Sequence, residues 1–457
     1  MRTAWLPLGF LCLCLALPSF ATERHYYVAA EDVTWDYAPS GLDLVEGKPI
    51  PPPWAKQTKW QKTRYIEYTD ATFTVRKPQP EWLGIMGPIF RAEVGDRIVV
   101  DFLNRSNMAH SIHPHGLRYD KDSEGAHYVP AGRGSLIGPN ARFTYRWIAD
   151  ENSGPGRGEL SSKVWWYHSH TAGPREINAG LVGAIIVTAR GKAKPDATPK
   201  DVDREFVAAF QIFDELRGQD AGMFHAINGY VFGNLPGYIM KKGEKVRWYV
   251  MGIGNEKDLH TPHWHGEVVS DMTRHMDVVD LLPASTLTVD MVADNVGVWM
   301  FHCHVADHME AGMMSTFTIY EPPKRACPIQ FVSGQFWVPD QYSVTVKNTS
   351  GKPIKEWILT SEHFLAPLYL HHPFDADWEP GGAIPAGGEQ TLRRRAYSQG
   401  GDKILGWALF PRKIVYADGS SWTPEQHGEC FQVYWRDKEQ PGIVVLPPAL
   451  ADVSQED

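Results

Sequence analysis

The sequence predicts an all-β protein made of two related β-sandwiches and a smaller third β-domain. Short runs rich in Val, Ile and aromatic residues are separated by Gly, Pro and Asn, a pattern typical of antiparallel sandwiches. The middle of the 457-residue chain contains an internal repeat. Residues 324–457 lack this repeat but still contain alternating strand-like segments. A chain of this length is expected to form about three domains.

The chain begins with a segment typical of secretory signals. Arg2 supplies the positive start, Leu6 to Leu17 form the apolar run, and Ser19-Phe20-Ala21 is a small-residue cleavage pattern. The apolar run is shorter than a membrane-spanning helix requires. We therefore expect residues 1–21 to be a signal peptide and the mature protein to be secreted or periplasmic, with no stable membrane span.

The repeat divides the rest of the chain. A Gly/Pro-bounded segment at 87–96 leads into a β-branched run and then a His-x-His-Gly motif, and a similar segment at 235–244 does the same. Each copy ends on an aromatic-rich strand with a second His-x-His pair. We expect a first sandwich over 22–195, a second over 204–323, a linker within 189–203, and an additional β-domain of unknown role over 324–457.

Charge and cysteine content narrow the possible partners and compartment. The formal net charge is −9, so a nucleic-acid partner is not expected. Cys12 and Cys14 leave with the signal. Cys327 and Cys430 remain as an even pair, which an oxidising compartment would join in a disulfide. Two unpaired buried thiols are the alternative.

The motif His302-Cys303-His304, followed by His308 and Met313, carries the most chemical information. A thiolate, imidazoles and a nearby thioether form the soft ligand set of a blue-copper site. In an extended strand, alternate side chains point to opposite faces. Cys303 can therefore bind one metal while the two flanking histidines reach other metals on the far face.

Four His-x-His pairs occur in the chain. Random placement of its 19 histidines would give about 0.8 such pairs. The other three are His113-Pro114-His115, His168-Ser169-His170 and His263-Trp264-His265, the last preceded by His260. Chance clustering of surface histidines is therefore a poor explanation.

Taken in order, these segments resemble the copper-binding motifs of the multicopper oxidases, over most of residues 60–322. The resemblance implies cupredoxin-like Greek-key sandwiches and four coppers per chain. It assigns His260, Cys303, His308 and axial Met313 to type 1 copper, and His113 and His263 to type 2 copper. One type 3 copper would take His115, His168 and His304, and the other His170, His265 and His302. It also implies that four one-electron oxidations of a reducing substrate at the type 1 copper are coupled to the reduction of dioxygen to water at the trinuclear cluster.

The first copy resembles a blue-copper site that has lost its ligands. His110 precedes His113 as His260 precedes His263, but Ser169 stands in the place of Cys303 and Pro174 in the place of His308. A serine hydroxyl cannot replace the soft thiolate. Only one blue centre per chain is therefore expected.

Proton supply and substrate choice suggest further site residues. Dioxygen reduction consumes protons, and Glu124 and Tyr119 stand where relatives have an acidic residue and a tyrosine near the cluster. Residues 223–229 resemble an iron-site segment of ceruloplasmin-like members, which makes His225, Asp220 and Asp307 candidates for an Fe(II) substrate site. A solvated loop acid is the simpler reading of Glu124, and structural roles are the simpler readings of His225 and Asp307.

Three functions stay open at this point. A ferroxidase and a laccase-type phenol oxidase differ in the surface beside His308. A non-catalytic copper carrier would need one type 1 site, whereas this chain has all eight histidines of the implied trinuclear cluster. Because the type 3 ligands come from both copies and the linker is short, we expect a homotrimer with clusters between subunits.

Overall fold

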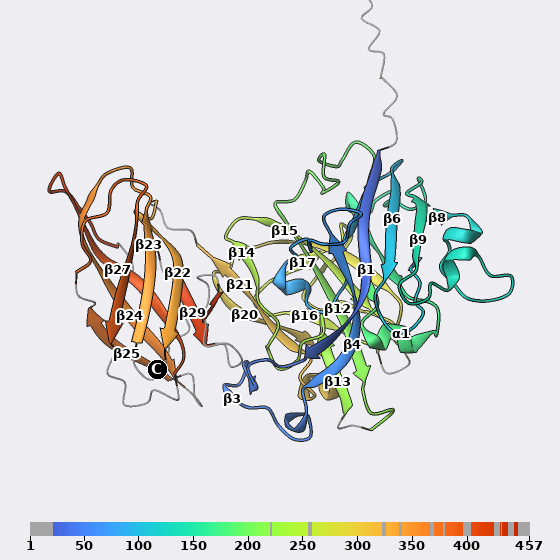
Figure 1. The fold of residues 1–457 in the computed structure, drawn as a ribbon, viewed down its shortest axis with the longest axis horizontal. Helices are drawn as coiled ribbons and strands as arrows, with labels where there is room; N and C mark the ends of the chain where they lie inside the picture. The colour runs from blue at the N-terminus through green and yellow to red at the C-terminus, as the bar shows by residue number, and fades with distance from the viewer. Residues whose placement is uncertain are drawn as a thin grey trace, which may run out of the picture.

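The computed structural model describes residues 22–219, 222–254, 258–321, 326–337, 341–365, 370–377, 380–395, 404–424, 430, 432–436 and 443–446. Strands dominate this part of the chain, and the all-β prediction is confirmed (Figure 1). The proposed signal peptide, residues 1–21, lies outside the described residues.

The first sandwich packs a five-stranded sheet, in the order β4-β1-β6-β9-β8, against a four-stranded sheet, β5-β11-β10-β7. Its core lies between the sheets and includes Tyr65, Phe102, Trp147 and Tyr167. Alternation of apolar residues in strands such as β9 directs one face of each sheet to this core. The strands are β1 Glu23–Asp36, β4 Lys59–Tyr68, β5 Phe90–Glu93, β6 Arg97–Asn104, β7 His113–Pro114, β8 Arg118–Tyr119, β9 Arg142–Ile148, β10 Ser162–His168 and β11 Val182–Thr188.

The second sandwich repeats this plan. A six-stranded sheet, β13-β12-β15-β19-β17-β18, faces a four-stranded sheet, β14-β21-β20-β16, around Trp248, Trp264, Phe301 and Phe317. Its strands are β12 Arg204–Asp214, β13 Met223–Ile227, β14 Tyr238–Lys241, β15 Lys245–Gly252, β16 Pro262–Trp264, β17 Val269–Ser270, β18 His275–Met276, β19 Thr286–Val292, β20 Gly297–Cys303 and β21 Met314–Tyr320.

The repeat places the His-x-His motifs at matching sheet edges. In the first sandwich β7 pairs with β10, which sets His113 opposite His168. In the second, β16 pairs with β20, which sets His263 opposite His302. Each His-x-His pair therefore faces its partner across an edge pair of strands.

The two sandwiches pack on each other through an apolar cluster. The outer face of β10 and β11 contributes Val164, Trp166 and Ile186, and β12 and β15 contribute Val207 and Tyr249. The segment expected to be the linker, 189–203, runs between β11 and β12 and contains none of the named strands. A second interface is formed by residues 35–60 against the second sandwich.

The region after the second sandwich forms further sheets, in the orders β22-β23-β26 and β25-β24-β27-β29-β30, with β28 beside β27. Trp357 and Leu409 lie in its core. The strands are β22 Ile329–Trp337, β23 Gln341–Asn348, β24 Ile354–Leu365, β25 Leu370–Asp377, β26 Glu389–Arg395, β27 Ile404–Tyr416, β28 Ser421–Trp422, β29 Gln432–Arg436 and β30 Ile443–Leu446.

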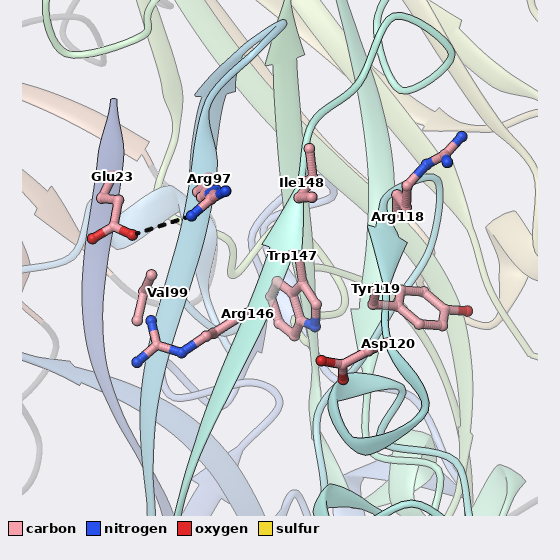
Figure 2. Close-up of a pocket in the computed structure, with 9 residues that line it drawn as sticks. All are labelled: Glu23, Arg97, Val99, Arg118, Tyr119, Asp120, Arg146, Trp147 and Ile148. Carbon is pink, nitrogen blue, oxygen red and sulfur yellow. Dashed lines mark ion pairs between the residues drawn. The ribbon is translucent and has the colours of Figure 1, made fainter. Parts of the chain in front are cut away.

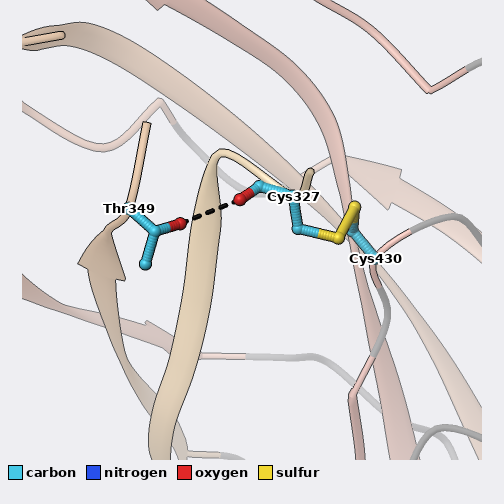
Figure 3. Close-up of a disulfide and its surroundings, with 3 residues drawn as sticks. All are labelled: Cys327, Thr349 and Cys430. Atoms are coloured by element: carbon cyan, nitrogen blue, oxygen red, sulfur yellow. Dashed lines mark hydrogen bonds between the residues drawn. A yellow bond between two sulfur atoms is a disulfide. The ribbon is translucent and has the colours of Figure 1, made fainter. Parts of the chain in front are cut away.

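The expected disulfide between Cys327 and Cys430 is present and closes a loop of 103 residues (Figure 3). Thr349 Oγ1 donates a 2.8 Å hydrogen bond to the Cys327 carbonyl. The bond therefore connects the start of the C-terminal sheets to the approach to β29.

Helices are few and short in the described chain. They are α1 Pro174–Ala179, α2 Ala306–Glu310, η1 Trp54–Lys56, η2 Glu81–Leu83, η3 Lys121–Ser123 and η4 Arg133–Ser135; a small hairpin is formed by β2 Leu42–Asp43 and β3 Lys48–Pro49. None of these described helices has the length and apolar character to traverse a bilayer.

Candidate metal centre

A thiol and two imidazoles converge inside the second sandwich. Cys303 ends β20, His308 lies in α2, and His260 pairs through its backbone with Leu281. Cys303 Sγ lies 3.6 Å from His308 Nδ1 and 3.9 Å from His260 Nδ1. All three side chains are buried, so they offer a desolvated set of one sulfur and two nitrogen ligands.

The surroundings favour a thiolate at Cys303. Burial alone would raise the pKa of this thiol, but hydrogen bonding to His260 and His308, together with the Thr261 amide, lowers it to about 6. Burial would also lower the pKa of His260, whereas Asp258 and Cys303 raise it. Met313 is fully buried, and its carbonyl accepts a 3.1 Å hydrogen bond from the Cys303 amide. This donor set fits the soft copper site that the sequence predicts.

A first group of four histidines gathers at the edge of the first sandwich. The ring centroids of His113, His115, His168 and His170 are 5.1–5.6 Å apart in the five pairs that make ring contacts. His115 Nε2 and His168 Nε2 approach to 3.0 Å. Burial is the main cause that lowers the pKa of His115 to about 4 and that of His168 to about 3. Both rings are therefore neutral at pH 7 and have a nitrogen lone pair for a metal.

The second sandwich holds a matching group. His263, His265, His302 and His304 have ring centroids 4.6–5.6 Å apart in their contacting pairs. His302 Nε2 lies 3.0 Å from His265 Nε2 and 3.2 Å from His263 Nδ1. Burial, followed by the neighbouring histidines, lowers the pKa of His302 to about 4.

These two groups, which we call the first and second half-sites, are separate in a single chain. Among the described residues, all contacts between histidine rings of the half-sites join members of the same half-site. The implied type 2 and type 3 ligand sets each combine residues from both. One chain therefore brings together His260, Cys303 and His308 of the implied type 1 set, but neither the type 2 set nor either type 3 set.

The first sandwich contains a counterpart of the type 1 set with different side chains. The Ser169 amide donates to the Leu181 carbonyl as the Cys303 amide donates to Met313, both at 3.1 Å. The Leu181 amide donates to the Glu176 carbonyl (3.1 Å), and the corresponding Met313 amide donates to His308 (2.9 Å). Glu176, and not Pro174, therefore occupies the position of His308. The expectation for Pro174 is wrong because the loop 170–180 is two residues longer than 304–312.

Hydrogen bonds join the three residues of this counterpart, His110, Ser169 and Glu176. Glu176 Oε2 lies 2.6 Å from His110 Nδ1 and accepts a 2.5 Å hydrogen bond from Ser169 Oγ. All three residues are buried, and His110 pairs with Ile137 through its backbone as His260 pairs with Leu281. Alignment of Gly180-Leu181 with Gly312-Met313, rather than counting from Ser169, would have identified Glu176 from the sequence.

The candidates for proton supply lie beside the first half-site. The Glu124 main-chain carbonyl lies 2.6 Å from His113 Nδ1, while its carboxylate binds Lys121 and accepts a 2.8 Å hydrogen bond from Tyr128. These bonds outweigh the effect of burial and lower the pKa of Glu124. The Tyr119 ring lies 6.0 Å from that of His113, and burial raises its pKa.

The candidates for an iron site surround the type 1 set only in part. The His225 ring, on β13, lies 4.9 Å from the His308 ring. Asp307 is exposed in the first turn of α2. Asp220 lies outside the described residues.

An open pocket of about 370 Å³ lies on the five-stranded sheet of the first sandwich (Figure 2). It is lined by Tyr119 and Trp147 and by the arginines Arg97, Arg118 and Arg146. None of the proposed copper ligands lines it, so the pocket and the candidate metal centre are different features.

Comparisons with known proteins find matches to both sandwiches. Two family models described as multicopper oxidase match residues 67–192 and 209–323. The human ferroxidase HEPHL1 is 35% identical over 337 residues, covering 65% of this chain and 29% of the relative. Mouse hephaestin is 34% identical, over 66% of this chain and 30% of the relative. Human ceruloplasmin is 32% identical, over 68% of this chain and 33% of the relative. The chain thus spans about a third of the length of these relatives.

Solved structures were also found. One described as a multicopper oxidase shares 21% identity and a TM-score of 0.48, covering 66% of this chain and 91% of that chain. A blue copper oxidase from Nitrosomonas europaea shares 20% identity and a TM-score of 0.47, covering 65% and 86%. The two family models together match more than half of the 457 residues, one on each sandwich. The chain therefore belongs to the multicopper oxidases.

Proposed function

We propose that this chain couples one-electron oxidation of a reducing substrate to the four-electron reduction of dioxygen to water. The observation that carries the proposal is Cys303, a buried thiol with a lowered pKa, on the same strand as His302 and beside His304. Bound copper would supply the one-electron chemistry and the reduction of dioxygen. The protein would provide a covalent connection of one residue between the site at Cys303 and the second half-site.

The residues that would hold copper follow from the two half-sites and the converging set. His260, Cys303, His308 and Met313 would hold type 1 copper. His113 and His263 would share type 2 copper. The type 3 pair would take His115, His168 and His304 on one side and His170, His265 and His302 on the other. Four coppers per chain is the resulting stoichiometry, and we propose Glu124 and Tyr119 as the groups that manage protons beside it.

We further propose that complete clusters form between subunits of a homotrimer. The separation of the half-sites supports this, since no single chain supplies eight converging histidines among its described residues. Apolar side chains are exposed near both half-sites. Exposed Tyr128 bonds the carboxylate of Glu124, whose carbonyl meets His113, and exposed Val268 follows His265 by three residues. Joining the first half-site of one subunit to the second of the next is a head-to-tail contact that three chains can close.

Mixing of inactive variants tests the shared cluster. One variant lacks the first half-site through His115→Ala, and the other lacks the second through His265→Ala. In randomly mixed trimers, about a quarter of the clusters would receive intact halves from two different chains. We expect oxygen consumption near that fraction of wild type after co-expression. No recovery, with an active copper-loaded monomer in light scattering, would contradict the shared cluster.

The substrate that we propose is Fe(II). His225 beside His308 and the exposed Asp307 support an entry point with an imidazole and a carboxylate, ligands that suit a hard iron ion. The sequence also offers Asp220, which lies outside the described residues. The relatives named ferroxidase agree with this choice. A laccase-type phenol oxidase is the second candidate, because half-buried Met309 directly follows His308 and, like Trp54, packs against the apolar cluster of Phe232 and Met314, where an aromatic substrate could make contact.

Side-by-side kinetics separate the two substrates. Asp307→Ala should raise KM for Fe(II) several-fold and leave KM for a bulky aromatic dye unchanged, since the dye needs no carboxylate. Copper content and the blue band should not change. Glu310→Ala, an exposed acid in the same helix, is the matched control. Equal effects on KM for both substrates would rule out the proposed iron site and favour the phenol oxidase. A copper carrier without turnover would oxidise neither substrate.

We also propose that the domains are residues 22–195, 204–323 and 324–457, and that the protein acts outside the cytoplasm after removal of residues 1–21. The disulfide between Cys327 and Cys430 supports an oxidising compartment. N-terminal sequencing of the exported protein would test the cleavage site, with a first residue near 22 expected.

A further inference from the structure

The connection between β1 and β4, residues 37–58, leaves the first sandwich and packs on the second (Figure 1). We call this segment the strap. It contains β2, β3 and η1, and its buried Tyr37, Ala38 and Ile50 share an apolar cluster with Phe224 and Phe232 of the second sandwich. A long connection from one domain thus covers part of the other.

Hydrogen bonds join the strap to the turn 231–234. Asn234 is the main anchor, since its side chain accepts from the Ser40 amide (3.0 Å) and donates to the Leu42 carbonyl (2.8 Å). Backbone hydrogen bonds extend the contact along the turn. The Val231 amide donates to the Tyr37 carbonyl (3.0 Å), and the Leu44 amide donates to the Phe232 carbonyl (2.9 Å). The turn is therefore held from the strap side by both backbone and side-chain bonds.

The same turn holds the loop that carries Met313. The Phe232 amide donates to the Gly312 carbonyl (2.8 Å), and the Gly233 amide donates to the Met314 carbonyl (3.0 Å). These bonds lie on either side of Met313. The Phe232 ring covers Gly312 so closely that a Cβ there would lie 2.7 Å from the ring, and Gly312 has a φ of +93°. The backbone of the loop therefore packs directly on the Phe232 ring, with no room for a side chain at position 312.

Trp54 adds a third contact on the outer side. Its ring lies 5.6 Å from that of Phe232, and its Nε1 donates a 2.7 Å hydrogen bond to the Met223 carbonyl. Met223 begins β13, which carries His225 beside His308. The strap thus contacts the two segments of the second sandwich that lie next to the type 1 set.

We propose that the strap is a positioning element for the axial ligand Met313, with Phe232 as the residue that transmits its effect. The inference rests on the proposed copper assignment. An axial thioether forms a weak, long bond, and its placement tunes the reduction potential of a blue-copper site. Since such a bond contributes little to its own geometry, the packing of Phe232 on Gly312 and the bonds on either side of Met313 would set that geometry.

Spectroscopy of the copper-loaded variants tests this. Phe232→Ala and Asn234→Ala should shift the visible bands, the spin-resonance parameters and the reduction potential of the blue centre, with copper content unchanged. The matched controls are Phe73→Ala for Phe232→Ala and Asn348→Ala for Asn234→Ala. Phe73 is also buried, at 2% exposed against 1% for Phe232, and has a φ of 54° against 53°. Asn348 is a buried asparagine that bonds three carbonyls in the C-terminal sheets. Both control variants should retain wild-type spectra.

Two further variants keep each outcome decisive. Phe232→Leu fills much of the same volume and tests the inference if Phe232→Ala does not fold; a smaller shift in the same direction is expected. Met313→Leu separates the two proposals. If Met313→Leu leaves the blue spectrum unchanged, the copper assignment is wrong. If Met313→Leu shifts the spectrum while the Phe232 and Asn234 variants match wild type, the strap does not position Met313.

Discussion

Removal of the Glu176 carboxylate should destabilise the first sandwich without removing any proposed copper ligand. Its Oε2 is bonded to Ser169 Oγ at 2.5 Å and to His110 Nδ1 at 2.6 Å, in a site where all three residues are buried. Glu176→Ala would leave two buried polar groups without this partner. Each such loss costs about 1–3 kcal/mol, so a reduction of about 3 kcal/mol in the free energy of unfolding is expected.

Hydrogen exchange on the metal-free protein would measure this locally. A loss of about 3 kcal/mol corresponds to exchange about 100-fold faster at amides protected by opening of the first sandwich. The amides of β10, which lead to Ser169, are the most informative. Glu176→Gln keeps the size and one acceptor and should cost less, about 1 kcal/mol.

Glu310→Ala is the control, because Glu310 is an exposed acid in the corresponding loop of the second sandwich. Less than threefold acceleration in Glu176→Ala, or an equal effect in both variants, would refute the reasoning. It would show that the bonds to Glu176 contribute little net stability, and that the first site does not need them to hold its shape without copper.

Three other predictions follow from the structure. Cys303→Ser should abolish the blue band entirely while circular dichroism remains native, since the first sandwich has Ser169 at the matching position. Glu31→Gln should lower the free energy of unfolding at pH 7. Burial raises the pKa of Glu31, but the bonds and charges of Tyr68, Arg105 and Arg76 outweigh this effect and lower it. This contribution is present above the unfolded pKa near 4.5 and is lost as pH falls below it, so urea midpoints of the two proteins should converge in acid. Replacing Cys327 and Cys430 by Ser should destabilise the C-terminal sheets by about 2–5 kcal/mol, seen by calorimetry as a lower first transition.

The proposed ligands were accessible from sequence because their signal is local. A spacing of two residues on a strand fixes which histidines share a face. In His302-Cys303-His304 the two histidines therefore point to one face and the cysteine to the other. The sandwich edges that oppose His113 to His168 and His263 to His302 then follow from the internal repeat. The all-β architecture followed from the same repeat and from the strand composition.

The features that sequence reasoning missed depend on loop length and distant contacts. Glu176 was overlooked because two extra residues in its loop break the count from Ser169 to the position of His308. The strap could not be predicted because Ser40 and Asn234 are 194 residues apart and have no motif. The separation of the half-sites was, by contrast, expected from the short linker between the two copies, although the motifs themselves are equally complete in sequence whether or not they meet.

Only the second sandwich has a cysteine between its two histidines, where the first has Ser169, and this difference predicts a direction for electron transfer in the proposed trimer. Cys303 and His302 are adjacent on β20, so the route from the blue centre to the cluster stays within the chain that supplies the second half-site. Mixing Cys303→Ser with the His115→Ala variant should restore activity in about a quarter of clusters, because one chain supplies the first half-site and the other supplies Cys303 with the second. Mixing Cys303→Ser with His265→Ala should restore none, since neither chain joins Cys303 to an intact second half-site. Recovery in the latter mixture would mean that electrons reach the cluster from another subunit's blue centre, and the short route through β20 would be wrong.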